Sequence, residues 1–145
     1  MTTNPTSPTY AGEISPTDTW KRLADDPTAK LVDVRTQAEW AYVGVPDLTQ
    51  LGKQPLLVSW QVFPSMARND AFAEQLAALG VKPDDTLLFI CRSGIRSKAA
   101  AEYLTPLGYS SCWNVADGFE GPHDEARHRG DKAGWKAANL PWVQG

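Results

Sequence analysis

One cysteine and the short loop after it carry the clearest chemical potential in this sequence. Cys91 directly follows the apolar run 87–90 and precedes a loop, 92–96, that opens into an alanine-rich stretch. Four large apolar residues bounded by turn signals are typical of a strand that is buried on both faces. The sequence therefore predicts that Cys91 lies at the carboxyl end of a parallel strand, which is where ligands bind in open α/β sheets.

That position favours the deprotonated, reactive form of the cysteine. Backbone N–H groups at the start of the following helix and two arginines in the loop stabilise an anion. Gly94 permits backbone angles that are closed to other residues, so successive loop amides can point inward as an anion-binding nest. We expect Cys91 to be an ionised nucleophile at neutral pH, with Arg92 and Arg96 holding the oxygens of an incoming oxyanion. The residues expected to bind the substrate are Arg92, Ser93, Gly94, Ile95 and Arg96.

Composition narrows the classes of protein that the sequence can encode. The 145 residues suit one domain, and the net charge of -3 argues against nucleic-acid binding. No apolar run is long enough to cross a bilayer, and residues 1–10, rich in Thr, Pro and Ser, predict a disordered lead rather than a secretory signal. We therefore expect a cytoplasmic protein whose cysteines are free thiols. The sequence has no metal-ligand spacing, so we expect neither metal nor cofactor.

Apolar periodicity predicts strands that alternate with helices. The expected strands are 11–14, 30–34, 56–58, 86–90 and 111–115. The expected helices begin at an N-cap at Ser15 and a capping box at Thr36, and cover 69–79 and 97–104. We expect Ile95, Ala99, Tyr103 and Leu104 to form the inner face of the helix behind the cysteine. This alternation predicts an α/β fold with a central, mainly parallel, five-stranded sheet and helices on both faces.

Two charged residues, one near the end of the second expected strand and one just after it, are expected to support the loop rather than to react. Asp33 ends that strand near the same sheet edge as Cys91, where its carboxylate can accept loop N–H groups. Arg35 is spaced for an i, i+4 ion pair with Glu39. Cys112, within the last expected strand, is expected to be a core residue.

The chain after residue 119 gives a weaker signal. Residues 118–122 predict a turn-rich loop and residues 123–131 are polar and charged, with His123 and His128 expected on exposed loops. Trp135 and Trp142 are too large and apolar to be left in water, so we expect the tail, 120–145, to dock on a core that extends to about residue 119.

Three motifs together resemble a single-domain rhodanese. They are Leu31-Val32-Asp33-Val34-Arg35-Thr36 with Glu39-Trp40 and Gly44 after it, the loop 91–97, and Asn114-Val115-Ala116-Asp117-Gly118-Phe119. The resemblance runs from about residue 13 to residue 119, within an expected rhodanese domain at 11–145. It implies a rhodanese-like α/β fold and a thiosulfate sulfurtransferase that works through a persulfide on Cys91.

The mechanism implied by the resemblance is a double displacement with ping-pong kinetics. Cys91 takes the outer sulfur of a small anionic donor, thiosulfate or a persulfide, and passes that sulfur to cyanide or a thiol acceptor. Thiosulfate, mercaptopyruvate, glutathione persulfide and a protein persulfide would all use the same cysteine. The sequence does not choose between them, nor does it predict an oligomeric state.

Three other functions are compatible with parts of the same pattern. A phosphatase or arsenate reductase also uses a cysteine in an anion-binding loop, but its loop has five residues between cysteine and arginine, whereas Cys91 and Arg96 enclose four. A Cys-His hydrolase would need His123 or His128 to fold back against Cys91. A non-catalytic rhodanese-like binding module commonly lacks the nucleophile, which is present here.

Overall fold

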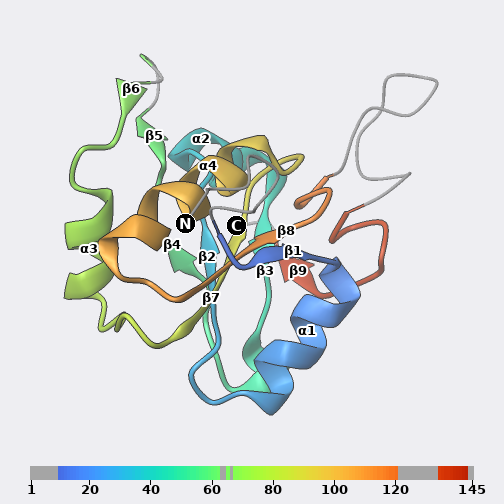
Figure 1. Cartoon of the computed structure of the whole chain (residues 1–145). Coiled ribbons are helices and arrows are strands. Elements are labelled where there is room, and N and C mark those ends of the chain that lie inside the picture. Colours follow the sequence, from blue (N-terminus) through green and yellow to red (C-terminus); the bar gives the residue numbers. More distant parts are fainter. Residues whose placement is uncertain (1–9, 63–64, 66, 121–133, 144–145) are drawn as a thin grey trace.

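A five-stranded parallel sheet forms the centre of the protein. The computed structural model describes residues 10–62, 65, 67–120 and 134–143 (Figure 1). The strand order is β1-β8-β7-β2-β4, and every neighbouring pair is parallel. The strands are β1 (Gly12–Ile14), β2 (Lys30–Asp33), β4 (Leu56–Leu57), β7 (Thr86–Ile90) and β8 (Ser111–Val115). The predicted fold class is confirmed, and β7, the strand before Cys91, is the central one.

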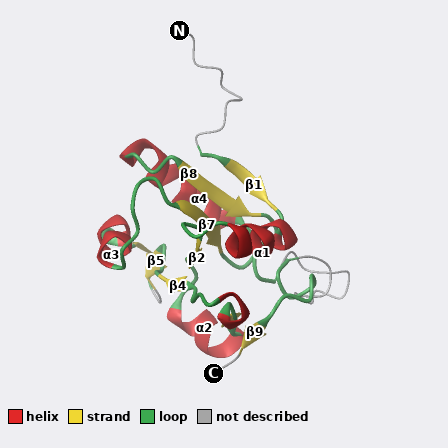
Figure 2. Cartoon of the chain, turned by 90° about the horizontal axis from the view of Figure 1, so that it is seen from below, coloured by secondary structure: helices red, strands yellow, loops and turns green. Residues whose placement is uncertain are grey.

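Helices cover both faces of this sheet. The α-helices are α1 (Pro16–Asp25), α2 (Gln37–Val43), α3 (Phe72–Ala78) and α4 (Ile95–Leu104), with short 3-10 helices η1 (Thr49–Leu51) and η2 (Thr105–Leu107). Successive strand residues point to opposite faces. Leu87 and Phe89 therefore join a cluster with α3 and α4, whereas Leu88 and Ile90 join a second cluster with α1. α1 and α3 lie on opposite sides of the molecule (Figures 1 and 2).

The two predicted helix caps are present. The Ser15 side chain accepts from the Asp18 N–H at 3.0 Å, with Pro16 at the first helical position. The Thr36 hydroxyl accepts from the Glu39 N–H while the Glu39 carboxylate accepts from the Thr36 N–H at 3.2 Å, which is a complete capping box. Each cap satisfies backbone donors that a helix start would otherwise leave unpaired. The second cap also fixes where the Glu39 side chain lies.

The inner face of α4 differs from the prediction. Ile95 was expected to be buried, but it is 78% exposed. The buried residues of this helix are Ser97, Ala100, Ala101 and Leu104, an i, i+3, i+4, i+7 set. Because two alanines form the centre of this face, the helix approaches β7 and β8 closely, and the first turn is placed against Cys91.

Two short antiparallel pairs were not predicted. β3 (Val45–Pro46) pairs with β9 (Trp142–Val143), and β5 (Gln61–Val62) pairs with β6 (Ala67–Arg68). The tail residue Trp135 is fully buried in the same core cluster as Leu23 of α1. The disordered lead predicted for residues 1–10 and the loops predicted around His123 and His128 lie outside the described residues, except for Tyr10.

Candidate active site

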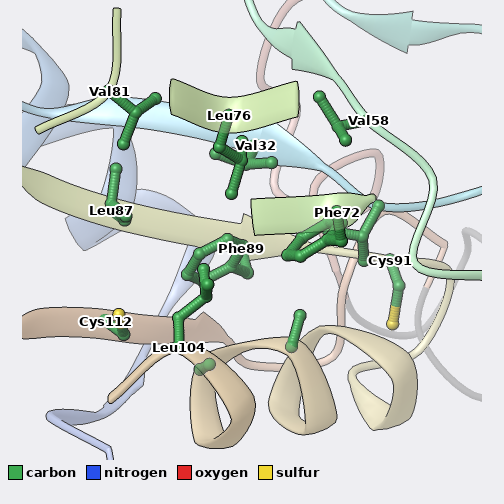
Figure 3. Close-up of a cluster of buried hydrophobic side chains, with 13 residues drawn as sticks. Val32, Val58, Phe72, Leu76, Val81, Leu87, Phe89, Cys91, Leu104 and Cys112 are labelled. Carbon is green, nitrogen blue, oxygen red and sulfur yellow. The ribbon is translucent and has the colours of Figure 1, made fainter. Parts of the chain in front are cut away.

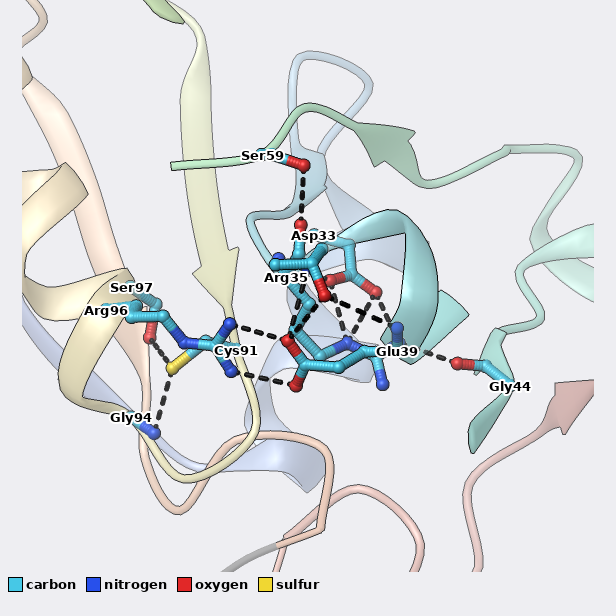
Figure 4. A network of polar contacts seen from close by, with 10 residues as sticks. Asp33, Arg35, Glu39, Gly44, Ser59, Cys91, Gly94, Arg96 and Ser97 are labelled. Atoms are coloured by element: carbon cyan, nitrogen blue, oxygen red, sulfur yellow. Dashed lines mark hydrogen bonds and ion pairs between the residues drawn. The ribbon is translucent and has the colours of Figure 1, made fainter. Parts of the chain in front are cut away.

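Cys91 lies directly after β7, at the point where the chain turns into α4. Its residue exposure is 1%, and it closes one end of the core cluster formed by Phe72 and Phe89 (Figure 3). The sulfur accepts hydrogen bonds from the Gly94 N–H at 3.1 Å and from the Ser97 hydroxyl at 3.2 Å (Figure 4). Gly94 has φ +108°, which a residue with a side chain rarely adopts. Among the described residues the sulfur is therefore held by one backbone amide and one hydroxyl, whereas successive loop amides were expected around it.

A chain of polar side chains extends from the buried sulfur to the exposed Glu13 of β1. The Ser97 hydroxyl lies within hydrogen-bond distance of both the Cys91 sulfur and Asn114 Oδ1. Asn114 Nδ2 donates to the Glu13 carboxylate at 2.9 Å and to the Gly94 carbonyl at 3.1 Å, which fixes the orientation of its amide. Ser97 has one hydroxyl proton and two acceptors for it, Asn114 Oδ1 and an ionised Cys91. The hydroxyl can therefore donate to only one of these two acceptors at a time.

Asp33 and Arg35 form a fully buried ion pair, with both side chains 0% exposed. Arg35 Nη2 donates to Asp33 Oδ2 at 2.7 Å and to the Gly44 carbonyl at 2.7 Å, and the guanidinium lies 4.3 Å from the centre of the Phe119 ring. The predicted Arg35–Glu39 pair is wrong, because Arg35 precedes α2 and helical spacing does not apply to it. This ion pair joins the ends of β2 and α2. Each of its two charges is neutralised by the other, which lowers the cost of burying them.

Glu39 instead pairs with Arg96 of the cysteine loop. Arg96 Nη1 donates to Glu39 Oε1 at 2.6 Å and Nη2 donates to Oε2 at 2.8 Å (Figure 4). Burial acts to raise the pKa of Glu39, but the hydrogen bonds and charge of Arg96, with donors at Thr36, lower it to about 2. The hydrogen bonds that Arg96 donates to Glu39, together with the negative charge of Glu39, raise the pKa of Arg96 even though burial acts to lower it. Arg96 is therefore held in place beside the sulfur by α2.

The remaining predicted site residues of the loop differ in how exposed they are. Arg92 is exposed, Ser93 is half-buried, and Ile95 points to solvent. Their assignment to substrate binding stays a prediction. No role was predicted for Ser97 or Asn114. Both nevertheless belong to motifs that carry the family resemblance: Ser97 is the last residue of the loop 91–97, and Asn114 is the first residue of the segment 114–119.

A second loop supports the cysteine loop from the carboxyl end of β8. The Phe119 N–H donates to the Cys91 carbonyl at 2.7 Å, and the Glu120 N–H donates to the Arg92 carbonyl at 3.0 Å. Gly118 allows this approach: it has φ +61°, and a Cβ placed there would lie 2.4 Å from the Cys91 carbonyl oxygen. The tail is bonded to the same segment, because the Trp135 N–H donates to the Gly118 carbonyl at 2.9 Å. Hydrogen bonds thus join the tail to the segment 118–119, and further hydrogen bonds join that segment to the cysteine loop.

Other features of the described residues lie apart from the cysteine. A cavity of about 570 Å³ between α2, α3 and β4 is lined by residues that include Trp40, Ser59 and Asn69, and by none of 91–96. Cys112 is buried, and burial raises the pKa of its thiol to about 11. Among the described residues no group of three His, Cys, Asp or Glu side chains could hold a metal ion. No described helix is long and apolar enough to cross a membrane.

The sequence matches the family described as the STR4 middle domain over residues 11–145. The chain belongs to this family. The match includes the loop 91–97, the segment 114–119 and the tail. Members of a family share a fold more reliably than an activity, so the site geometry has to carry the argument about function.

Three similar proteins each cover about three quarters or more of this member of the STR4 middle domain family. A crystal structure of Rv0390 from Mycobacterium tuberculosis is 47% identical with a TM-score of 0.85, covering 94% of this chain and 99% of that one. An uncharacterised Rickettsia rickettsii protein, a homologue of RP600, is 39% identical over 89% of this chain and 94% of its own length. A protein of Allochromatium vinosum named sulfurtransferase is 31% identical over 74% of this chain and 83% of its own length.

The fold is rhodanese-like. A crystal structure of a rhodanese-like domain protein from Staphylococcus aureus superposes with a TM-score of 0.56 at 22% identity, covering 81% of this chain and 96% of that one. At this level of identity the likeness concerns the fold alone.

Proposed function

We propose that the protein is a sulfurtransferase that carries sulfane sulfur as a persulfide on Cys91. The observation that carries the proposal is the surroundings of the Cys91 sulfur: the Gly94 N–H and the Ser97 hydroxyl converge on it at the start of α4. Two donors and a helix N-terminus stabilise a negative sulfur. The charged outer sulfur of a persulfide needs the same kind of donors, so one site serves both states of the enzyme.

The proposed reaction has two displacements. The Cys91 thiolate attacks the outer sulfur of the donor, the donor's S–S bond breaks, and its electron pair leaves with sulfite from thiosulfate or with a thiolate from an organic persulfide. The outer sulfur of the Cys91 persulfide is then attacked by cyanide or a thiolate, and the cysteine thiolate is released. Electrons balance within each step, so no metal, cofactor or external oxidant is needed.

The structure offers no residue among those described that would serve as a general base for Cys91. Its sulfur has a hydroxyl and an amide as neighbours, both of which donate. This arrangement suits sulfur transfer, in which the nucleophile attacks and the leaving group departs as sulfur anions, so that neither displacement needs a proton to be transferred. We also propose that the protein works in the cytoplasm, where thiols are kept reduced and Cys91 stays free to react.

Intact-protein mass spectrometry after incubation with thiosulfate, and separately with an alkyl persulfide, tests the proposal. We expect the mass of one added sulfur atom, located on the peptide that contains Cys91, and its loss on addition of cyanide. Cys91→Ser should abolish the adduct, and the matched Cys112→Ser variant should retain it. A protein that gains no sulfur from either donor, or that hydrolyses p-nitrophenyl phosphate instead, would overturn the proposal.

A further inference from the structure

The ion pair between Glu39 and Arg96 limits how the site can treat an anion. Arg96 was predicted to bind an oxyanion. Its two terminal nitrogens, Nη1 and Nη2, form a fork that already donates to both carboxylate oxygens of Glu39, at 2.6 and 2.8 Å. That fork is the geometry that binds two oxygens of a sulfonate or carboxylate. The side chains of both partners are less than one-fifth exposed, so water screens the pair weakly.

Charges around the sulfur are balanced pair by pair. Arg96 is neutralised by Glu39, and Arg35 is neutralised by Asp33 in a pair with no exposure. The remaining loop cation, Arg92, is exposed. A Cys91 thiolate therefore faces surroundings with little net positive charge beyond helix amides, and each further negative charge on a donor adds to the repulsion.

We infer that Glu39 is a specificity-determining residue that makes the site favour singly charged organic persulfides over doubly charged thiosulfate. This inference rests on the proposed function, of which it defines the donor class. Thiosulfate carries two charges and a sulfonate group that would need the fork of Arg96, which Glu39 occupies. An organic persulfide carries one charge, on the sulfur that is transferred, and needs no oxyanion fork.

Glu39 suits this role because a close variant can change its charge alone. Its carboxylate also accepts from the Thr36 N–H in the capping box that starts α2. Glutamine at this position of a capping box makes the same bond. Glu39→Gln therefore keeps the helix start, removes the negative charge, and releases the full charge of Arg96 toward the sulfur.

The expected effect differs between the two donors by a fixed rule. The Coulomb energy between Glu39 and a donor is proportional to the charge of the donor, so it is twice as large for a dianion as for a monoanion. The fold decrease in KM on removing the Glu39 charge is therefore squared for the dianion. If Glu39→Gln lowers KM for mercaptoethanol persulfide by about threefold, it lowers KM for thiosulfate by about tenfold. The kcat values change little, because the sulfur and its two donors are untouched.

The test measures KM and kcat of the wild type and of Glu39→Gln with thiosulfate and with mercaptoethanol persulfide, at low salt. Adding Arg96→Ala to Glu39→Gln should cancel the gain with thiosulfate, since the freed guanidinium supplies it. Glu74→Gln, an equal charge change on an exposed position of α3, is the matched control and should alter neither KM. Glu39→Asp, which keeps the charge, should retain the wild-type preference.

Each outcome decides between a specificity role and a structural role. An unchanged ratio of the two KM values in Glu39→Gln, or an equal loss of activity with both donors, would show that Glu39 only holds the loop and would overturn the inference. Sulfur uptake by the wild type from either donor would still support the proposed function in that case. If the wild type takes sulfur from neither donor, the proposed function fails and the inference fails with it.

Discussion

Replacing Ser97 with alanine tests how the protein stabilises charge on Cys91. The variant removes one of the two hydrogen bonds to the sulfur and leaves the Gly94 amide in place. A hydrogen bond to a charged acceptor contributes about 1.5 to 3 kcal/mol. The lower end applies here, because in the thiolate state Ser97 gives up its bond to Asn114 Oδ1 to make the bond to sulfur. About 1.5 kcal/mol corresponds to an approximately tenfold smaller ratio of thiolate to thiol.

The measured rate should change less than this ratio. A thiolate that is less stabilised is also more nucleophilic, and its higher rate constant offsets about half of the tenfold loss of thiolate on a logarithmic scale, that is, about threefold. On the acidic side of the profile, where thiolate is the minor form, alkylation of the Ser97→Ala variant should be about threefold slower than in the wild type. On the alkaline plateau, where both proteins are fully ionised, the variant should be about threefold faster. The two rate profiles should therefore cross.

The assay is alkylation of Cys91 by iodoacetamide over the pH range, read by peptide mass spectrometry. Ser93→Ala, the same substitution in the same loop, is the control and should follow the wild-type profile. Urea unfolding shows whether each variant is folded, since Asn114 Oδ1 loses a donor in Ser97→Ala. Profiles that coincide at all pH values, or a uniform fall without a crossing, would refute the view that this hydroxyl stabilises the thiolate.

Three further predictions follow from other contacts. Cys112 should remain unlabelled by iodoacetamide at neutral pH in the folded protein, because burial raises the pKa of its thiol to about 11; peptide mapping of the Cys91→Ser variant checks this. Glu39 has a folded-state pKa of about 2 against an ordinary value of 4.5, so its stabilisation should be complete above about pH 4.5 and lost as the pH falls through about 2; the difference in free energy of unfolding between wild type and Glu39→Gln, measured in urea, should shrink over that window and not above it. Gly118→Ala should destabilise the protein by at least about 2 kcal/mol and abolish sulfur uptake, since the added methyl group would meet the Cys91 carbonyl; a variant with unchanged unfolding and uptake would contradict that contact.

The parts of the fold that depend on local chemistry were predictable from the sequence. The caps at Ser15 and Thr36 are short-range hydrogen bonds whose residue types and spacing define them. β7 is recognisable because a strand between two layers of helices must be apolar on both faces. The position of Cys91 at the end of β7 followed from that one strand.

The contacts that were missed depend on partners far away in the chain. Glu39 and Arg96 are 57 positions apart, so no periodic pattern joins them, and an apparent helical spacing assigned Glu39 to Arg35 instead. On α4 the prediction of a buried Leu104 is confirmed, but that of a buried Ile95 is wrong; Ser97, a polar residue, is buried instead because its hydroxyl finds partners in the interior. β9 has two residues and pairs with β3 across most of the chain, which leaves no local signal.

The bonding of residues 134–140 to the segment beside the cysteine has a consequence for synthesis on the ribosome. The Trp135 N–H reaches Gly118 and the Lys136 N–H reaches Phe119, and Phe119 in turn holds the Cys91 carbonyl. A nascent chain that has emerged only as far as residue 120 has Cys91 and its loop but lacks Trp135, which fills the second core cluster with Phe119. The full set of these hydrogen bonds around Cys91 can therefore form only after residue 136 has left the ribosome.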